Sequence, residues 1–361
     1  MTQPLTMARG PVMVGVDGLS LSAQERARLS HPAVGGVILF RRNFASVAQV
    51  SALCAEIHAI RTPALLIAVD HEGGRVQRFL SGFTRLPPMR VLGSLWQNDP
   101  EQACARAETV GYVLAAELRA CGVDLSFTPV LDLDWSKSAI IGDRSFGRAP
   151  EAVTALALAL RHGLKRGGMA SCGKHFPGHG GVEADSHLAV PVDERTLAEL
   201  ERDDLQPFAQ LAAAGMEAVM PAHVVYRQVD ALPAGFSRVW LQDILRGELQ
   251  FDGVIFSDDL GMEGAAGVGG FVERGRVALA AGCDMVLVCN RPDMAEQLLA
   301  ELAPPENVDL ACRLARMQGG GTPEAWQSVL RTPAFAASQQ EVSGLAPEER
   351  SIAGPAVGEA S

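Results

Sequence analysis

The sequence predicts an α/β protein that folds as a single (β/α)8 TIM barrel. Between residues 12 and 302, apolar segments alternate with segments of helical character, and there are eight of each. The apolar segments are continuous rather than alternating, which is typical of parallel strands buried on both faces. Eight such units in a row favour a closed barrel of parallel strands surrounded by helices.

The apolar segments VMVGVD and ALLIAVD both end in an acid, and VGGVILF ends at a pair of arginines. We expect strands at residues 12–17, 34–40, 64–70, 123–130, 168–175, 217–225, 253–258 and 284–290. We expect the helices that follow them at residues 21–30, 47–60, 100–121, 151–166, 196–214, 239–247, 273–281 and 292–302. Asn98 or Asp99 is placed to cap the third helix, and one more helix is expected at 323–330.

An open, doubly wound sheet is the alternative fold. Its glycine fingerprint, GxGxxG, is absent after the first predicted strand. Polar residues lie where a barrel needs them, at or just beyond the C-terminal ends of the strands. They are Asp17, Asp70, Lys174, His175, His223, Asp258 and Asn290. In a barrel these ends meet on one face, where the active site forms.

Charge and composition argue against two classes of partner. A net charge of −11 disfavours nucleic-acid binding, which needs a basic surface. No uninterrupted apolar run approaches the roughly 18 residues of a membrane helix. The N-terminal MTQPLTMARG lacks the features of a secretory signal, and the seven cysteines form no CxxC pair. We expect a cytoplasmic, monomeric protein with reduced thiols and no cofactor.

Two regions are expected along the chain. Residues 1–333 form the catalytic domain. Residues 334–361 are small, polar and acidic, with too few large apolar side chains to offset the entropy of ordering. We expect this tail to be mobile and dispensable for activity.

The segment 172–191, CGKHFPGHGGVEADSHLAVP, carries the densest group of reactive side chains. Its glycines and prolines indicate that most of it is loop. Asp185 and His187 are two residues apart, so in an extended loop they can lie on the same side. The carboxylate can then accept a hydrogen bond from one imidazole nitrogen and leave the other to exchange a proton with a substrate.

Asp258 and Asp259 end the seventh predicted strand in FSDDLGM. Successive side chains of a strand face opposite sides, so one of the two carboxylates is expected to be structural. A carboxylate nucleophile combined with a separate acid/base group is the logic of retaining glycoside hydrolysis.

The motifs VDHEGGRVQR, GDRSFG, KHFPGHG, DSHLAVP and FSDDLGM resemble the cytoplasmic β-N-acetylglucosaminidases of glycoside hydrolase family 3. The resemblance covers about residues 10–300. It implies a (β/α)8 barrel that removes N-acetylglucosamine from anhydro-muropeptide fragments during cell-wall recycling, with retention and through a glycosyl-enzyme. The substrate is therefore expected to be a small aminosugar or muropeptide.

The resemblance also implies residue roles. Asp258 is the expected nucleophile, His187 the general acid/base and Asp185 the residue that orients His187. The sugar-binding residues are expected to be Asp70, Arg78, Arg144, Lys174 and His175. His71 and Glu72 are expected to act from behind these residues, His179 to order its loop, and His223 to be a satisfied histidine at a strand end.

Three other functions remain open at this point. The residues His175, His179, His187, Asp70 and Asp258 could form the metal site of a hydrolase, although Lys174 beside them disfavours a cation; we expect no metal. A sugar-binding barrel without activity is a second possibility. Phosphorolysis is a third, because a neutral histidine repels phosphate less than a glutamate does.

Overall fold

The computed structural model describes residues 5–183, 190–302 and 308–346. Within these residues, eight parallel strands form one sheet that curves into a nearly closed barrel. The strands are β2 (Val12–Gly15), β3 (Val34–Leu39), β5 (Leu66–Val69), β8 (Leu125–Ser126), β9 (Cys172–Phe176), β11 (Ala218–Pro221), β13 (Val254–Asp259) and β14 (Met285–Val288). Each overlaps one of the predicted strands, so the barrel prediction is confirmed.

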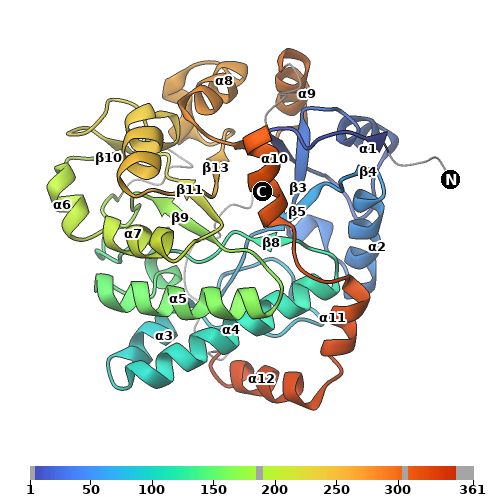
Figure 1. Cartoon of the computed structure of the whole chain (residues 1–361), viewed down its shortest axis with the longest axis horizontal. Coiled ribbons are helices and arrows are strands. Elements are labelled where there is room, and N and C mark those ends of the chain that lie inside the picture. Colours follow the sequence, from blue (N-terminus) through green and yellow to red (C-terminus); the bar gives the residue numbers. More distant parts are fainter. Residues whose placement is uncertain (1–4, 184–189, 303–307, 347–361) are drawn as a thin grey trace.

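The strands follow one another around the barrel in chain order. β8 and β9 close the circle through parallel bridges from Leu125 to Ala170 and from Val130 to Lys174. Helices connect the strands on the outside (Figure 1). The C-terminal ends of the strands therefore open on the same face, where side chains from distant parts of the chain can meet.

The main helices are α1 (Ala23–Leu29), α2 (Val47–His58), α3 (Met89–Trp96), α4 (Pro100–Ala120), α5 (Pro150–Arg166), α6 (Leu197–Arg202), α7 (Leu205–Ala213), η4 (Val239–Glu248), α8 (Phe271–Ala281), α9 (Pro292–Glu301), α10 (Val308–Met317), α11 (Pro323–Val329) and α12 (Pro333–Ser343). Short helical turns are η1 (Arg41–Asn43), η2 (Gly142–Arg144), η3 (Ala234–Phe236) and η5 (Glu263–Val268). Asp99 caps α4 as expected, because its carboxylate accepts the backbone N–H of Gln102 at 2.9 Å. The helix predicted at 196–214 is divided into α6 and α7.

In the described part of the chain, three small sheets lie outside the barrel. They pair β1 (Leu5–Thr6) with β4 (Arg61–Thr62), β10 (Val192–Asp193) with β12 (Val225–Tyr226), and β6 (His71–Gly73) with β7 (Val76–Gln77). The hairpin β6–β7 lies between residues 70 and 100, where no strand or helix is predicted. Its turn uses Gly73 and Gly74, whose φ angles of 119° and 54° suit glycine.

The barrel core explains why the strands are continuously apolar. Every residue of β3 is buried, because helices cover the outer face and other strands' side chains fill the inner one. The rings of Phe127 and Phe256 meet edge to face with centroids 5.2 Å apart. These residues come from the regions of β8 and β13, which are not neighbours in the sheet, so this contact crosses the barrel interior.

Buried or half-buried carboxylates connect the starts of three strands to arginines on the surrounding helices. The pairs are Asp124 with Arg119, Glu217 with Arg161, and Asp284 with Arg246. Each carboxylate also accepts a backbone N–H from a neighbouring strand segment, from Ile67, Ser171 and Ile255 respectively. This arrangement lies at the N-terminal end of the barrel, away from the predicted site, where residues of this fold serve stability rather than catalysis.

Replacement of Asp124 by asparagine is expected to destabilise the protein by about 3–5 kcal/mol, because it leaves the buried charge of Arg119 uncompensated. Thermal or denaturant unfolding measures this loss. Asp252→Asn is the matched control, since its ion pair with Arg316 is exposed and contributes only about 0–1 kcal/mol. Equal losses in the two variants would contradict the role given to Asp124.

The same site predicts a pH dependence. Burial alone raises the pKa of Asp124, but the hydrogen bond from His58 and the charges of His58 and Arg119 outweigh it and hold that pKa below its ordinary value. A carboxyl with a depressed folded pKa contributes stability above its unfolded pKa of about 4 and loses it as the pH falls through the folded value. The stability difference between the wild type and Asp124→Asn should therefore be full at neutral pH and narrow below about pH 4.

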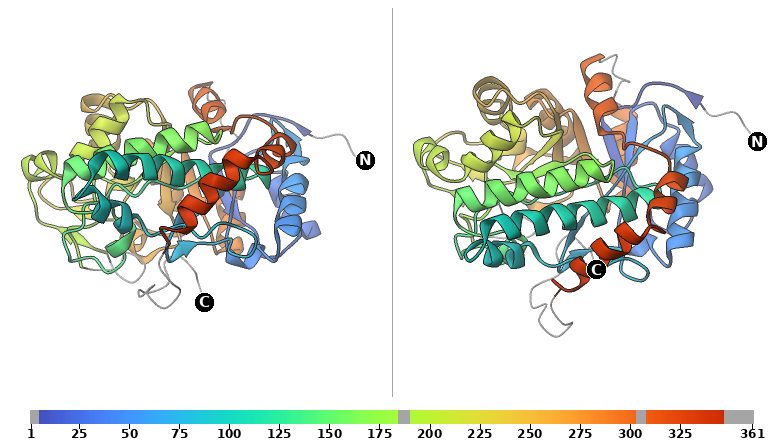
Figure 2. Two further views of the ribbon diagram at one scale, coloured as in Figure 1. Left: turned by 90° about the horizontal axis from the view of Figure 1, so that it is seen from below. Right: turned by 60° about the horizontal axis from the view of Figure 1, so that its bottom comes forward.

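The predicted boundary of the disordered tail at residue 334 is wrong. Residues 333–343 form α12, which packs against α4 on the outside of the barrel (Figures 1 and 2). Phe335 and Val342 are seven residues apart, lie on one face of the helix and are 2% and 0% exposed. The average composition of residues 334–361 is polar, so it gave no indication of these two buried apolar side chains. The helix predicted at 323–330 is confirmed as α11, and residues 347–361 lie outside the described part.

Candidate active site

Four of the predicted site residues lie at the C-terminal ends of three barrel strands. Asp70 follows β5, Lys174 and His175 lie within β9, and Asp258 is the penultimate residue of β13. β9 gains one residue relative to β11, because Lys174 pairs with Met220 and Phe176 with the next residue, Pro221. His175 is the extra residue, and such a bulge redirects side chains beside an active site.

Lys174 is the centre of a network of charges. Its Nζ lies 2.8 Å from Oδ1 of Asp70 and 2.6 Å from Oε1 of Glu72. Burial alone lowers the pKa of Lys174, but the charges of Asp70 and Glu72 outweigh it, so the net shift is upward and the ammonium stays charged. The side chain of Asp70 is 21% exposed and that of Glu72 is 3% exposed. Asp70 is therefore the carboxylate that a ligand can reach, and Glu72 supports it from behind.

The two predicted arginines have different partners. Arg144 donates from Nε and Nη2 to the two carboxylate oxygens of Glu72, both at 2.8 Å, and from Nη1 to the carbonyl of Ile140. Arg78 lies 4.0 Å from Asp70 and its side chain is 3% exposed. Asp143, an alternative partner for Arg144, instead pairs with Arg75 at 3.0 Å. Sugar binding by Arg78 and Arg144 remains a prediction.

His175 is held by a residue that the sequence reasoning did not assign. Its Nδ1 donates to Oδ2 of Asp132 at 2.6 Å, which directs Nε2 away from the carboxylate. Asp132 is fully buried and also accepts the backbone N–H groups of His175 and His179. The signal for Asp132 is its place just beyond the fourth predicted strand, the same signal that identified Asp70 and Asp258.

The two neighbouring aspartates of β13 have separate roles, as the strand pattern predicts. The carboxylate of Asp259 accepts the backbone N–H groups of Gly261 and Cys289 at 3.1 and 3.2 Å. Burial, with a contribution from the charge of Asp258, raises the pKa of Asp259 to about 6. Asp259 thus fastens the turn after β13 to the end of β14, which leaves Asp258 as the candidate nucleophile.

Asp258 and the Lys174 network act electrostatically on the same buried group, the thiol of Cys172. Burial raises the pKa of the Cys172 thiol; the charge of Lys174 opposes this rise, and those of Asp70 and Asp258 add to it. Cys172 begins β9 and is fully buried. One thiol inside the barrel therefore experiences the charges of the predicted nucleophile and of two predicted sugar-binding residues.

Three further histidines are buried near the site. Burial lowers the pKa of His71 to about 3 and that of His179 to about 4, so both are neutral at physiological pH. His179 orders its loop through its backbone, which donates to Asp132 at 2.6 Å. His223 donates from Nε2 to the carbonyl of Asp259 at 3.0 Å and stacks on Phe236; its structural role remains a prediction.

Asp185 and His187 lie outside the described residues, so their predicted roles rest on the sequence. The chain on both sides of them is firmly held. Arg195 bridges the carboxylates of Asp193 and Asp204, and Asp204 also accepts Nε1–H of Trp135 at 3.0 Å. On the other side, the hydroxyl of Tyr226 donates to the carbonyl of Gly178 at 2.8 Å.

The arrangement suits the recognition of a neutral, hydroxyl-rich ligand close to a carboxylate at the end of a barrel strand. Asp70, Lys174 and His175 offer acceptors and donors, and the carboxylate of Asp258 is of the type that can act as a nucleophile. Among the described residues, no group of three or more His, Cys, Asp and Glu side chains is placed to hold a metal ion. No helix in the described ranges is both long enough and apolar enough to span a membrane. All seven cysteines are free thiols.

Comparison with known proteins gives close relatives. A family model described as the glycosyl hydrolase family 3 N terminal domain matches residues 6–313. The beta-hexosaminidase of Chromobacterium violaceum is 66% identical over 356 residues, which are 99% of this chain and 100% of the relative. The beta-hexosaminidase of Neisseria gonorrhoeae is 58% identical over 98% of each chain.

Solved structures agree with the sequence relatives. NagZ from Neisseria gonorrhoeae, in complex with N-trifluoroacetyl-D-glucosamine, has a TM-score of 0.91 and is 57% identical, covering 95% of this chain and 100% of that one. A glycoside hydrolase family 3 β-N-acetylglucosaminidase from Paenibacillus has a TM-score of 0.79 at 32% identity. It covers 93% of this chain and 67% of the Paenibacillus chain.

Proposed function

Because the chain belongs to glycoside hydrolase family 3 and is a β-N-acetylhexosaminidase, we propose that it recycles cell-wall fragments. In this proposal it removes terminal N-acetylglucosamine from the non-reducing end of GlcNAc-1,6-anhydroMurNAc and its peptides. It acts as a cytoplasmic monomer and retains the anomeric configuration. The observation that carries the proposal is Asp258, a carboxylate near the C-terminal end of β13, on the barrel face that also holds the Asp70–Lys174 pair.

Sugar binding is assigned to polar residues whose side chains are oriented by ion pairs and hydrogen bonds to neighbouring residues. Asp70 accepts hydrogen bonds from sugar hydroxyls, and the ammonium of Lys174, which lies 2.8 Å from it, holds the carboxylate in place. His175 directs Nε2 to the sugar because Asp132 occupies Nδ1. Arg78 and Arg144 complete the set, each with a planar group of N–H donors.

The reaction takes two displacements. In the first, a carboxylate oxygen of Asp258 bonds to the anomeric carbon, the glycosidic bond breaks, and His187 gives its proton to the departing oxygen. In the second, His187 takes a proton from water, and the water oxygen replaces Asp258 on the anomeric carbon. Asp185 holds the imidazole in the orientation and protonation state that both steps need. Two inversions give net retention.

Product analysis tests this proposal. Purified protein incubated with GlcNAc-1,6-anhydroMurNAc should release N-acetylglucosamine, and NMR at early times should detect the β-anomer first. The rate and the product should be the same with and without phosphate. The α-anomer as first product would contradict the double displacement, and N-acetylglucosamine 1-phosphate in phosphate buffer would indicate phosphorolysis instead.

A further inference from the structure

Helix α12 contacts helix α4 and also the chain segment that leads from the β6–β7 hairpin to α3. Gln339 in α12 donates from Nε2 to the hydroxyl of Thr84 at 2.9 Å and to Oε1 of Glu117 in α4 at 3.2 Å. Thr84 belongs to the chain segment 74–88, which follows the turn of the β6–β7 hairpin. One side chain near the C-terminal end of the described chain is therefore bonded to a segment that also carries the predicted sugar-binding residue Arg78.

Thr84 and Glu117 form a buried connection between α12 and this segment. Thr84 donates its backbone N–H to Oε2 of Glu117 at 2.9 Å and its hydroxyl to Oε1 at 2.6 Å. The two residues are 4% and 6% exposed. Burial raises the pKa of Glu117, and the hydrogen bonds from Thr84 and Gln339 act against that rise. Oε1 of Glu117 therefore accepts two hydrogen bonds, and loss of either donor leaves this buried oxygen with only one, which weakens the connection.

The connection continues to the residue next to Arg78. Gln77 donates from Nε2 to the carbonyl of Thr84 at 2.9 Å, and its Oε1 accepts the backbone N–H of Leu86 at 2.9 Å. Across the hairpin, Gln77 pairs with His71, which directly follows Asp70. Gln77 thus fixes the two chain positions, Asp70 and Arg78, whose side chains lie 4.0 Å apart in the candidate site.

We propose that α12 is a positioning element for the sugar-binding site, with Gln339 acting through Thr84 and Gln77 on Arg78. Gln339 is a positioning residue and does not touch the substrate. The proposal rests on the role assigned to Arg78 under the proposed function. The family model ends at residue 313, so α12 lies outside the segment that the family model matches.

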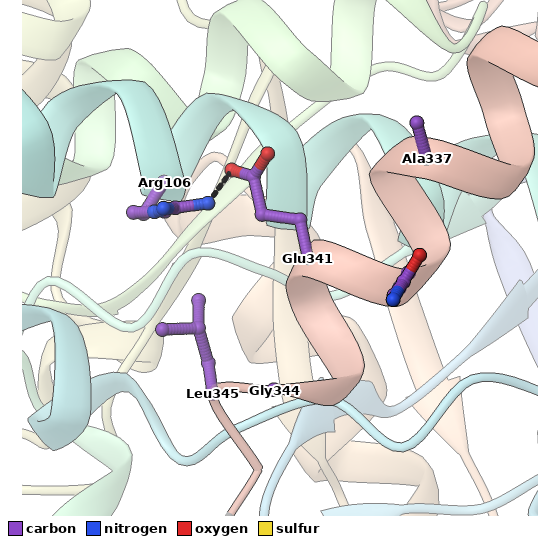
Figure 3. Close-up of a pocket in the computed structure, with 6 residues that line it drawn as sticks. Arg106, Ala337, Glu341, Gly344 and Leu345 are labelled. Atoms are coloured by element: carbon purple, nitrogen blue, oxygen red, sulfur yellow. Dashed lines mark ion pairs between the residues drawn. The ribbon is translucent and has the colours of Figure 1, made fainter.

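The chain offers a matched control on the same helix. Glu341 in α12 forms an ion pair with Arg106 of α4, beside a surface hollow that is also lined by Gly344 and Leu345 (Figure 3). This ion pair fastens α12 to α4 without a bond to segment 74–88. Gln339→Met and Glu341→Gln therefore both remove one contact between α12 and α4, but only the first removes a contact with the segment.

The test combines steady-state kinetics on 4-nitrophenyl β-N-acetylglucosaminide with hydrogen–deuterium exchange of segment 74–88. Gln339→Met should raise KM about threefold to tenfold, the equivalent of one hydrogen bond, and change kcat by less than about twofold. Exchange within 74–88 should accelerate. Glu341→Gln should leave both quantities unchanged. Thr84→Val should raise KM and accelerate exchange as Gln339→Met does. Thr84→Ser, which keeps the hydroxyl, should have the KM and exchange rates of the wild type.

One outcome would overturn the inference, and one further variant separates it from a failure of the proposed function. If Gln339→Met and Thr84→Val lower the melting temperature but leave KM and the exchange of 74–88 as in Glu341→Gln, α12 is only structural and the inference is overturned. Arg78→Lys separates this failure from a failure of the proposed function. If that variant keeps the wild-type KM, Arg78 does not bind sugar, and the exchange comparison alone decides whether α12 positions the segment.

Discussion

Replacement of Asp258 by asparagine is expected to abolish turnover while the protein stays folded. Asparagine has nearly the same shape but cannot attack the anomeric carbon, so the first displacement fails. The loss should be on the order of 10⁴-fold or more in kcat, the scale seen when hydrolases lose a nucleophile or its partner. Release of 4-nitrophenol from the N-acetylglucosaminide measures it, and circular dichroism verifies the fold.

Asp259→Asn is the control because it alters the adjacent carboxylate. The oxygen of asparagine can still accept the backbone N–H groups of Gly261 and Cys289 that Asp259 binds. This variant should keep activity within about tenfold of the wild type, the equivalent of about one hydrogen bond. An inactive Asp259→Asn beside an active Asp258→Asn would mean that the wrong carboxylate has been assigned.

The second large effect is expected at His187. Glycosyl-enzyme formation needs a proton on the departing oxygen, and imidazole can supply it near neutral pH because its unperturbed pKa is about 6.5. His187→Ala should therefore slow the first step by about 10²–10⁴-fold for a sugar leaving group. The loss should be much smaller for a nitrophenyl leaving group, which hardly needs protonation.

The ratio of the two losses is the measurement. Asp185→Ala should give the same pattern in a milder form, because Asp185 only orients His187 and favours its protonated state. Equal losses of rate for the sugar and nitrophenyl substrates would show that His187 binds the substrate or supports the loop, and that it does not transfer a proton. The acid/base would then have to be another group on the rim of the barrel.

The sequence was sufficient for the barrel because its strands are buried on both faces. Segments such as 34–39 are apolar without alternation, and the structure buries every one of these residues. Chain order then places the strand ends on one face, which is why Asp70, Lys174 and Asp258 could be grouped before their contacts were known. Periodicity and strand ends are local features, and a single sequence displays them directly.

Partner choice was not predictable in the same way. Arg144 binds Glu72 rather than Asp143, and His175 binds Asp132, because these pairs depend on how loops from different strands approach one another. Glu72 and Asp132 are polar residues beyond strand ends, like many helix caps. Only their burial and their cationic or imidazole partners distinguish them from caps, and neither property is visible in the chain.

The tail was misjudged for a thermodynamic reason. Average composition from residue 334 onward indicated too little apolar surface to order the chain, but α12 needs only Phe335 and Val342 because α4 already provides the opposing surface. Phe335 packs against Tyr112 of α4 with ring centroids 6.1 Å apart. Gln339, on the same helix, then makes its bonds to Thr84 and Glu117. Deletion from residue 333 onward should therefore lower both stability and substrate affinity.

The central claim is that Asp258 forms a covalent bond with the sugar. A 5-fluoro glycosyl fluoride of N-acetylglucosamine tests it most directly, because the ring fluorine slows both displacements while fluoride leaves readily. Mass spectrometry of the treated protein should detect one added sugar, and fragmentation should place it on Asp258. A label on Asp259 or any other residue, or no label on a protein that still consumes the reagent, would contradict the claim.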